Sequence, residues 1–295
     1  MARWTLAVVA VALLAGCGST SDETFAYDDA PLAVQQGKRV NQDYPVAVHE
    51  VSYASGRARV DGFLVAATRA QRVPGLVYVH GAGGNRAQLL VPATWIAARG
   101  AVALAVTLPT LGAAPPESLS AEDALRWQHD AIVDNVIAVR HALDLLGADE
   151  RVDPERLGLV GWSAGGRVGA IVAGIDERVR ATVLMSAGAS PVSEYADAAP
   201  TELRDAVTEL LAPIDPLTRI GDAEGALLLQ AGRTDSVVPA RALRALAAAA
   251  PKGTRIEWYQ SEHALNAQAH RDQLDWLAGQ LGIDGPPTTG AAIGP

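Results

Sequence analysis

The sequence predicts an α/β fold, in which helices cover both faces of a mostly parallel, doubly wound sheet. Short apolar runs alternate with amphipathic helical segments along much of the 295-residue chain, as repeated βαβ units require. The runs at 75–79 and 156–160 are almost wholly apolar, which is typical of strands buried on both faces. Apolar residues make up 49% of the chain and charged residues 19%, so a substantial core can form. We expect one domain, because α/β folds commonly fill this length.

The first 16 residues predict a secretory signal. Met1-Ala-Arg3 is a short positive start, and residues 6–15 form an apolar run that is too short to span a bilayer. Leu14-Ala-Gly-Cys17 resembles the lipobox of bacterial lipoproteins, in which the signal is cut before a cysteine that is then acylated. The alternative is an ordinary signal peptide with an incidental cysteine. We expect an exported protein, lipid-anchored through Cys17 to a bacterial membrane on its extracytoplasmic side.

Three further segments follow from composition. Residues 17–44 are rich in Ser, Thr, Asp and Gln with little apolar periodicity, which predicts a flexible tether. The folded domain is predicted over 45–282. Residues 283–295 contain Gly, Pro and Thr and are predicted to form a mobile tail.

The elements of the domain are expected in the following order. An antiparallel hairpin at 45–53 and 57–68 opens the domain and is predicted to form an edge of the sheet. The later strands are predicted at 75–79, 101–107, 156–160, 181–186, 226–230 and 254–259. Helices are predicted at 88–99, 120–146, after 163, at 239–249 and at 264–280. Ser120 and Asp123 resemble a capping box at the start of the longest helix, whose apolar stripe should pack on the sheet.

The stretch 188–222 interrupts this alternation with four prolines around one short amphipathic segment. An insertion at the carboxyl edge of the sheet would overhang the place where α/β folds bind ligands, so we expect a short lid. An ordinary surface excursion with one covering helix is the open alternative.

The stretch Gly161-Trp-Ser-Ala-Gly165 matches G-x-S-x-G, the nucleophile elbow, which presents a serine on a sharp strand-to-helix turn. A predicted buried strand precedes it and a helix of small residues follows it. Ser163 is therefore the predicted nucleophile. A serine hydroxyl needs a base within hydrogen-bond reach, and a third group must orient that base.

In the fold to which such an elbow belongs, the orienting acid and then the base follow the serine in the chain. Only His263 and His270 lie downstream. His263 falls in a loop after a strand, at the edge that bears Ser163, whereas His270 lies inside a helix where a solvated surface role is expected. Asp235 follows the strand 226–230 and is predicted to orient His263. The alternative for Asp235 is a turn residue that bonds to its own backbone.

The segment His80-Gly-Ala-Gly-Gly-Asn85 follows the strand 75–79 and predicts an oxyanion turn, because glycines let backbone N–H groups point at a developing negative charge. His80 is expected to pin this loop. A phosphate-binding turn is the alternative, but the G-x-G-x-x-G order and an acidic ribose partner about 20 residues further on are both missing.

Through these motifs, residues 45–281 resemble an α/β-hydrolase, in particular the dienelactone-hydrolase-like and prolyl-oligopeptidase-like esterases. The resemblance implies that the N–H groups of Ala82 and Ala164 stabilise the oxyanion, with Gly83 as the fallback donor. It also supports Asp235, because these hydrolases commonly place their acid in a G-x-x-D segment before V-P.

The expected function is a serine hydrolase that cleaves carboxylic esters through an acyl-enzyme intermediate. A serine peptidase of the prolyl-oligopeptidase type is one alternative, although no long N-terminal propeller precedes the domain. A non-catalytic surface binding protein on a hydrolase fold is the other. The latter is disfavoured because serine, acid and histidine all stand in the required order.

Composition also limits the partners. The net charge of −9 and the lack of clustered Lys or Arg predict no basic surface that could bind nucleic acid. The histidines show no metal-ligand spacing, and we expect no cofactor. The expected partners are a small ester or acyl substrate and, through Cys17, a membrane; the oligomeric state is not predicted. Trp95, Trp127 and Trp162 could line a pocket or belong to the core, and the sequence does not separate the two.

Overall fold

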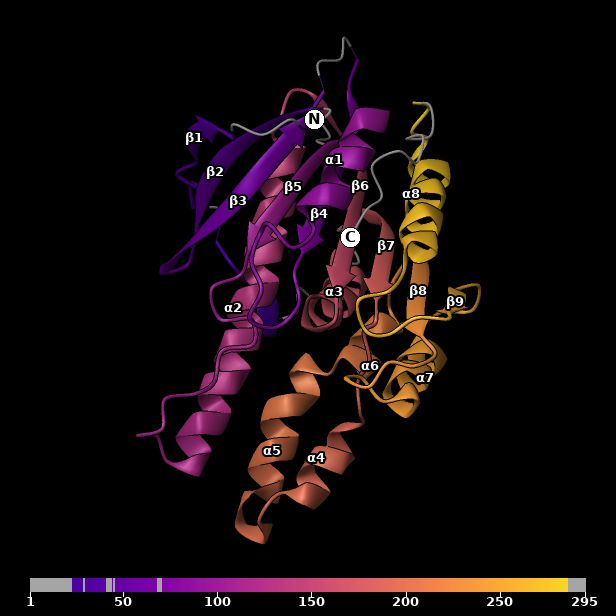
Figure 1. Ribbon diagram of the computed structural model, residues 1–295. Coiled ribbons are helices and arrows are strands. Elements are labelled where there is room, and N and C mark those ends of the chain that lie inside the picture. Colours follow the sequence, from indigo (N-terminus) through magenta and orange to yellow (C-terminus); the bar gives the residue numbers. More distant parts are fainter. Residues whose placement is uncertain (1–22, 29, 41–43, 45, 68–70, 286–295) are drawn as a thin grey trace, which may run out of the picture.

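The computed structural model describes residues 23–28, 30–40, 44, 46–67 and 71–285. These residues form one sheet with the strand order β1-β2-β3-β5-β4-β6-β7-β8-β9 (Figure 1). Strands β1, β2 and β3 run antiparallel, and β3 pairs antiparallel with β5. All later pairs are parallel. The predicted mostly parallel, doubly wound sheet with an N-terminal hairpin is confirmed.

The element bounds lie close to the predicted ones for most of the domain. The strands are β1 (Gln35–Arg39), β2 (Ala47–Ser55), β3 (Ala58–Ala66), β4 (Val73–Val79), β5 (Val102–Thr107), β6 (Val152–Trp162), β7 (Val179–Met185), β8 (Ala226–Gly232) and β9 (Arg255–Tyr259). The main helices are α1 (Leu90–Arg99), α2 (Ala121–Gly147), α3 (Ala164–Ile175), α7 (Ala240–Ala249) and α8 (Ala267–Leu281).

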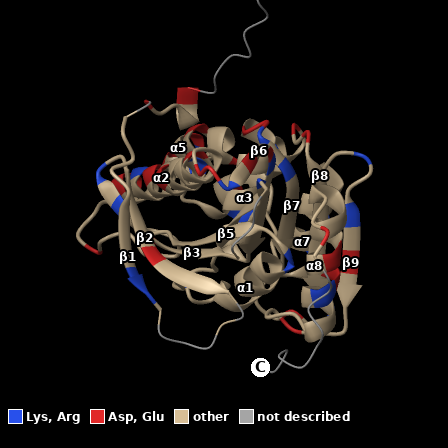
Figure 2. Ribbon diagram, turned by 90° about the horizontal axis from the view of Figure 1, so that it is seen from above, with Lys and Arg blue, Asp and Glu red and all other residues tan. Residues whose placement is uncertain are grey.

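Helices cover both faces of the sheet, with α1 and α8 on one face and α2 and α3 on the other (Figure 2). Strand β4 shows why its sequence is apolar throughout. Leu76 and Tyr78 pack into the core under α1 and α8, whereas Val77 and Val79 pack into the core on the α2 side. A strand with two buried faces must be apolar at every position, because successive side chains point to opposite faces.

The order of the strands determines where a ligand can bind. The chain runs from β4 outward to β5 and then returns to β6 on the other side of β4. In open α/β sheets, a crevice forms at such a reversal, outside the carboxyl ends of the strands. The oxyanion turn follows β4 and Ser163 follows β6, so both predicted motifs lie at this crevice.

The prediction of a flexible tether is wrong for the described residues between 23 and 40. Phe25 is 0% exposed and packs in the core beside α2, and Arg140 donates a hydrogen bond of 2.8 Å to the Phe25 carbonyl. Strand β1 pairs with β2, so the hairpin is not the sheet edge. The polar composition of this segment predicted a tether, but an edge strand such as β1, which is exposed along its length, needs no apolar face.

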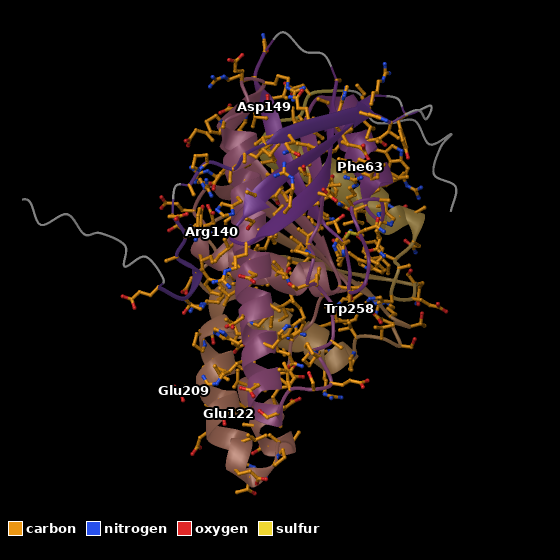
Figure 3. The ribbon with its side chains drawn as sticks, turned by 90° about the vertical axis from the view of Figure 1, so that its left-hand side faces the viewer. Phe63, Glu122, Arg140, Asp149, Glu209 and Trp258 are labelled. Atoms are coloured by element: carbon orange, nitrogen blue, oxygen red, sulfur yellow. The ribbon has the colours of Figure 1, made fainter. Side chains whose placement is uncertain are left out.

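Helix α2 begins as predicted, since the Ser120 side chain accepts a hydrogen bond from the Asp123 N–H at 3.1 Å. Only the C-terminal part of its apolar stripe packs on the sheet, through residues such as Val136 and Leu143. The N-terminal part continues past the sheet beside α5 (Arg204–Leu211), so that Glu122 and Glu209 lie at the same end of the molecule (Figure 3). The expected packing of the stripe on the sheet is therefore confirmed from Ile132 onward and does not extend to Leu125.

The insertion at 188–222 contains more helix than predicted. Helix α4 (Val192–Ala198) packs against α5, and the two project beyond the carboxyl edge of the sheet (Figure 1). A third helix, α6 (Pro216–Ile220), packs against α3 and buries Ile220 completely. The role of this segment as a lid stays a prediction.

The chain remains packed beyond α8. Ile283 is 6% exposed and belongs to the core under α1 and α8, and Gly285 lies against the backbone of Arg99. The predicted mobile tail is therefore wrong for 283–285, and its remainder lies outside the described residues. Within the described part of the chain, no helix has both the length and the apolar character that a membrane span requires.

Candidate active site

Ser163 lies at the turn between β6 and α3, with φ of 55° and ψ of −117°. A serine with positive φ is strained, and surrounding contacts must hold it in place. The flanking glycines make the turn possible. A Cβ at Gly161 would lie 2.4 Å from the Gly165 carbonyl oxygen, and a Cβ at Gly165 would lie 2.3 Å from the His80 carbonyl oxygen. The G-x-S-x-G pattern is thus a packing requirement, because neither glycine position has room for a side chain.

The structure brings the three residues of the predicted triad into one hydrogen-bonded line. His263 Nε2 lies 2.9 Å from Ser163 Oγ, and His263 Nδ1 lies 2.8 Å from Asp235 Oδ2. Asp235 comes from the loop after β8, and His263 comes from the loop between β9 and α8. The Asp235 side chain is 1% exposed and that of His263 is 15% exposed. Water therefore reaches the imidazole but hardly reaches the carboxylate.

Asp235 bonds both to His263 and to nearby backbone N–H groups, so both interpretations of its sequence position apply. Its Oδ1 accepts hydrogen bonds from the N–H groups of Val237 at 2.8 Å and Val238 at 2.9 Å, while Oδ2 faces His263. Burial by itself raises the pKa of Asp235, but the bonds with His263 and the two N–H groups outweigh it and hold the net pKa below its ordinary value. The carboxylate is therefore ionised at neutral pH.

His80 holds the glycine-rich turn after β4. Its Nε2 accepts a hydrogen bond of 3.0 Å from the Leu108 N–H, so the ring proton is on Nδ1, which donates to the Gly81 carbonyl at 2.6 Å. Burial lowers the pKa of His80, although the bond to Gly81 opposes this shift. A neutral imidazole with a hydrogen bond at each ring nitrogen suits a structural role. The same turn is held by Gln88, whose Oε1 accepts a hydrogen bond of 2.8 Å from the Gly81 N–H.

The three backbone donors considered for the oxyanion differ in their partners. The Gly83 N–H donates to the Leu111 carbonyl at 3.1 Å, so it is already engaged. Neither Ala82 N–H nor Ala164 N–H donates to an acceptor within the part of the chain that the structure describes. Gly112 fixes the position of this turn from outside, since a Cβ there would lie 2.6 Å from both the Ala82 Cβ and the Gly83 nitrogen.

Several other predicted residues lie elsewhere. The solvated surface role expected for His270 is wrong, because the side chain is half-buried on α8 with its Nδ1 atom enclosed, and this burial lowers its pKa. Trp95 belongs to the core at 7% exposure, and Trp127 is half-buried on the projecting part of α2. Trp162 lies at the site, with its ring centroid 5.2 Å from that of His263. Cys17 lies outside the described residues.

Sequence reasoning did not find the supporting roles of Gln88 and Gly112. Both belong to loops without a recognised motif. Their roles depend on through-space neighbours, which leave no local signal. Among the described residues, no three His, Cys, Asp or Glu side chains are grouped so that they could hold a metal ion.

The sheet, with a serine elbow after β6 and a histidine before α8, defines this protein as an α/β-hydrolase. The chain belongs to the dienelactone hydrolase family, whose model matches residues 60–278. This family assignment confirms the resemblance drawn from the motifs. A comparison with curated protein sequences finds no match.

Solved structures with the same fold include several esterases. The chain is 20% identical to the acetyl xylan esterase from Paenibacillus sp. R4, with a TM-score of 0.70 over 85% of this chain and 90% of that one. It is 18% identical to acetyl xylan esterase 1 from Thermoanaerobacterium sp. JW/SL YS485, with a TM-score of 0.69 over 85% and 88%. A cold-adapted esterase from an Arctic intertidal metagenomic library is also 18% identical, with a TM-score of 0.61 over 83% and 98%. At these identities, the likeness shows the fold.

Proposed function

We propose that this protein is a serine hydrolase that cleaves carboxylic esters through Ser163, His263 and Asp235. The observation that carries the proposal is the hydrogen-bonded line from Ser163 Oγ through the His263 ring to Asp235. Family membership and the esterases among the structural neighbours support a hydrolase of the esterase type. The ionised Asp235 supports the same role, because a carboxylate stabilises the imidazolium that forms during the reaction.

In the proposed mechanism, Ser163 Oγ attacks the ester carbonyl carbon while His263 Nε2 takes the hydroxyl proton. The N–H groups of Ala82 and Ala164 donate to the oxyanion of the tetrahedral intermediate. His263 then returns the proton to the leaving alcohol, and the C–O bond breaks to give an acyl-enzyme. A water molecule, deprotonated by His263, attacks the acyl carbon, and the acid product leaves as Ser163 regains its proton.

The oxyanion turn gives a first prediction. Gly112→Ala is expected to lower kcat by about 10² to 10³, the cost of removing one oxyanion donor, because the new Cβ would displace Ala82. Gly112 also has φ of 81°, which disfavours any side chain. KM should change little, since the donor acts mainly on the intermediate. Steady-state kinetics on a p-nitrophenyl ester measure both constants.

Gly147→Ala is the matched control, because nothing lies within 4 Å of the Cβ it would add. This control should keep the kcat of the wild type. A Gly112→Ala enzyme with undiminished kcat would show that the turn does not supply the oxyanion donors.

Ester specificity is tested with a series of p-nitrophenyl esters of increasing acyl length, run beside p-nitroanilides of proline-containing peptides. Turnover of the esters alone supports the proposal, and the acyl length with the highest kcat/KM measures the acyl pocket. Faster turnover of the anilides would favour the peptidase alternative. Binding of esters without turnover would favour a surface protein that uses the fold only for binding.

We also propose, from the sequence, that the protein is anchored to a bacterial membrane through an acylated Cys17. Acylation with two or more chains gives stable membrane attachment, whereas one chain does not. Cys17→Ser is therefore expected to move the protein from the membrane fraction to the soluble fraction of the cell envelope. Immunoblots of the two fractions measure this shift, with Ser163→Ala as a control that should remain in the membrane. A Cys17→Ser protein that stays in the membrane fraction would contradict the proposal.

A further inference from the structure

The main-chain carbonyl of His263 accepts two side-chain hydrogen bonds. Trp162 Nε1 donates one at 3.0 Å, and Ser186 Oγ donates the other at 2.8 Å. Trp162 is the last residue of β6 and Ser186 directly follows β7, its neighbour in the sheet. A carbonyl oxygen has two lone pairs, so both of its acceptor sites are in use. The histidine loop is thus attached to two adjacent strand ends that are 101 and 77 residues away in the chain.

Other hydrogen bonds hold the rest of this loop, whereas Trp162 and Ser186 hold the His263 carbonyl. The Thr234 N–H after β8 donates to the Ser261 carbonyl at 3.1 Å. The Leu265 N–H donates to the Glu262 carbonyl at 3.2 Å, and Leu265 has φ of 60°, so the chain turns sharply just after His263. His263 therefore lies between two constrained points, and its own carbonyl is fixed by Trp162 and Ser186.

Trp162 contacts three parts of the site. Its ring lies beside the His263 ring, with centroids 5.2 Å apart and planes inclined at 41°. A Cβ at Gly81 would lie 2.9 Å from the Trp162 ring, so the ring also packs closely under the oxyanion turn. The next residue is Ser163. One side chain thus sets the spacing between nucleophile, base and oxyanion turn.

Ser186 is held in a conformation that favours glycine. It has φ of 47°, it is 0% exposed, and its N–H donates to the Gln230 carbonyl at 2.7 Å. A non-glycine residue with positive φ is strained, and such strain persists only where other contacts over-determine the conformation. Glycine would relieve the strain and would lack the hydroxyl. The bond to His263 is the interaction that this hydroxyl makes.

We infer that Trp162 and Ser186 are positioning residues, which hold the His263 carbonyl so that its ring stands between Ser163 and Asp235. The inference rests on the proposed function. Proton transfer needs the imidazole within hydrogen-bond reach of both partners, and a displacement of about 1 Å can cost on the order of 100-fold in rate. Since the ring reaches Ser163 and Asp235 at 2.9 Å and 2.8 Å, little displacement is tolerated.

Two variants remove one donor each. Trp162→Phe keeps an aromatic ring against His263 but lacks the N–H, and Ser186→Gly lacks the hydroxyl and relieves the positive φ. Each is expected to lower kcat about tenfold with KM nearly unchanged, because the other donor still holds the carbonyl. The double variant is expected to lose more than the product of the two single losses, since nothing then fixes the carbonyl.

Two measurements report on the alignment of His263 directly. The rate at which a fluorophosphonate labels Ser163 measures the activation of the nucleophile without depending on the natural substrate, and it should fall in parallel with kcat. The downfield proton NMR signal of His263 Nδ1–H, bonded to Asp235, should broaden or vanish in the double variant. The Tm of Ser186→Gly should equal or exceed that of the wild type, so that lost activity cannot be ascribed to unfolding.

Ser55→Ala and Trp95→Phe are matched controls. Ser55 Oγ also bonds a buried histidine, His141 Nδ1 at 2.9 Å, but away from the site, and Trp95 belongs to the core. Both controls should lower Tm while labelling of Ser163 stays at the wild-type rate.

The inference is overturned if Trp162→Phe and Ser186→Gly label at the wild-type rate, or if the controls lose as much labelling as the test variants. Should Trp162→Phe fail to fold, Ser186→Gly decides alone, because it relieves strain. A wild-type protein that does not react with the fluorophosphonate overturns the proposed function and this inference together. A reactive wild type with unaffected variants overturns the inference alone.

Discussion

Ser163→Ala is expected to lower kcat for the preferred ester by on the order of 10⁵ to 10⁶, the loss typical of removing the serine of such a triad. Alanine has no oxygen that can attack the acyl carbon, so no acyl-enzyme forms. The Tm should remain close to that of the wild type, because serine and alanine tolerate the φ of 55° equally poorly and the flanking glycines are unchanged. The kcat is measured with the p-nitrophenyl ester of highest kcat/KM.

Labelling by a fluorophosphonate supplies the second measurement for this variant. The wild type should take up one label on Ser163, located by peptide mass spectrometry, and Ser163→Ala should take up none. Ser55→Ala serves again as the control and should label normally. Hydrolysis by Ser163→Ala at an appreciable fraction of the wild-type rate would defeat the mechanism, because it would show that another group attacks the ester.

Asp235→Asn is expected to lower kcat by about 10⁴, the loss known for an asparagine in place of a triad aspartate. The asparagine carbonyl can keep the two bonds from the Val237 and Val238 N–H groups, which leaves its NH₂ group facing His263 Nδ1. Nδ1 must then accept a hydrogen bond, so the ring proton moves to Nε2. That tautomer cannot take the proton of Ser163.

The structure offers a matched control for this variant. Asp215 also accepts a hydrogen bond from a backbone N–H two residues on, that of Leu217 at 3.0 Å, where it caps the short helix α6. Asp215→Asn keeps an acceptor at this position and should leave kcat unchanged. Thermal unfolding of both variants shows whether the fold is intact. A wild-type rate for Asp235→Asn would remove Asp235 from the proposed mechanism.

Most of the parallel sheet was predictable because each strand carries a local signal. The apolar run at 75–79 became β4 within two residues, since a strand buried on both faces leaves no choice of residue type. The bond from the Asp123 N–H to the Ser120 hydroxyl starts α2 where the capping pattern predicted. The elbow at Ser163 has an equally local cause, the lack of space for a Cβ at Gly161 and Gly165.

The errors fall where burial comes from tertiary contacts. Phe25 stands in a polar stretch, and its complete burial depends on tertiary neighbours that are distant in the chain, such as Arg140, which is 115 residues away. His270 has charged neighbours in the sequence, yet its position on α8 leaves it half-buried. Helix α4 was not predicted, because a helix this short depends on its packing against α5 more than on its own sequence.

For the proposed active site, the sequence by itself determined the residue types, their order and the strand after which each loop begins. These properties depend on local geometry: glycines at a tight turn and buried strands that deliver their loops to one edge. Only the tertiary structure decided that the Gly83 N–H bonds to the Leu111 carbonyl and that Gly112 packs against Ala82. It also decided that Trp162 and Ser186 bond to the His263 carbonyl. The reason is distance along the chain. Ser163 and His263 are 100 residues apart, and a contact between them exists only once the sheet has brought their loops together.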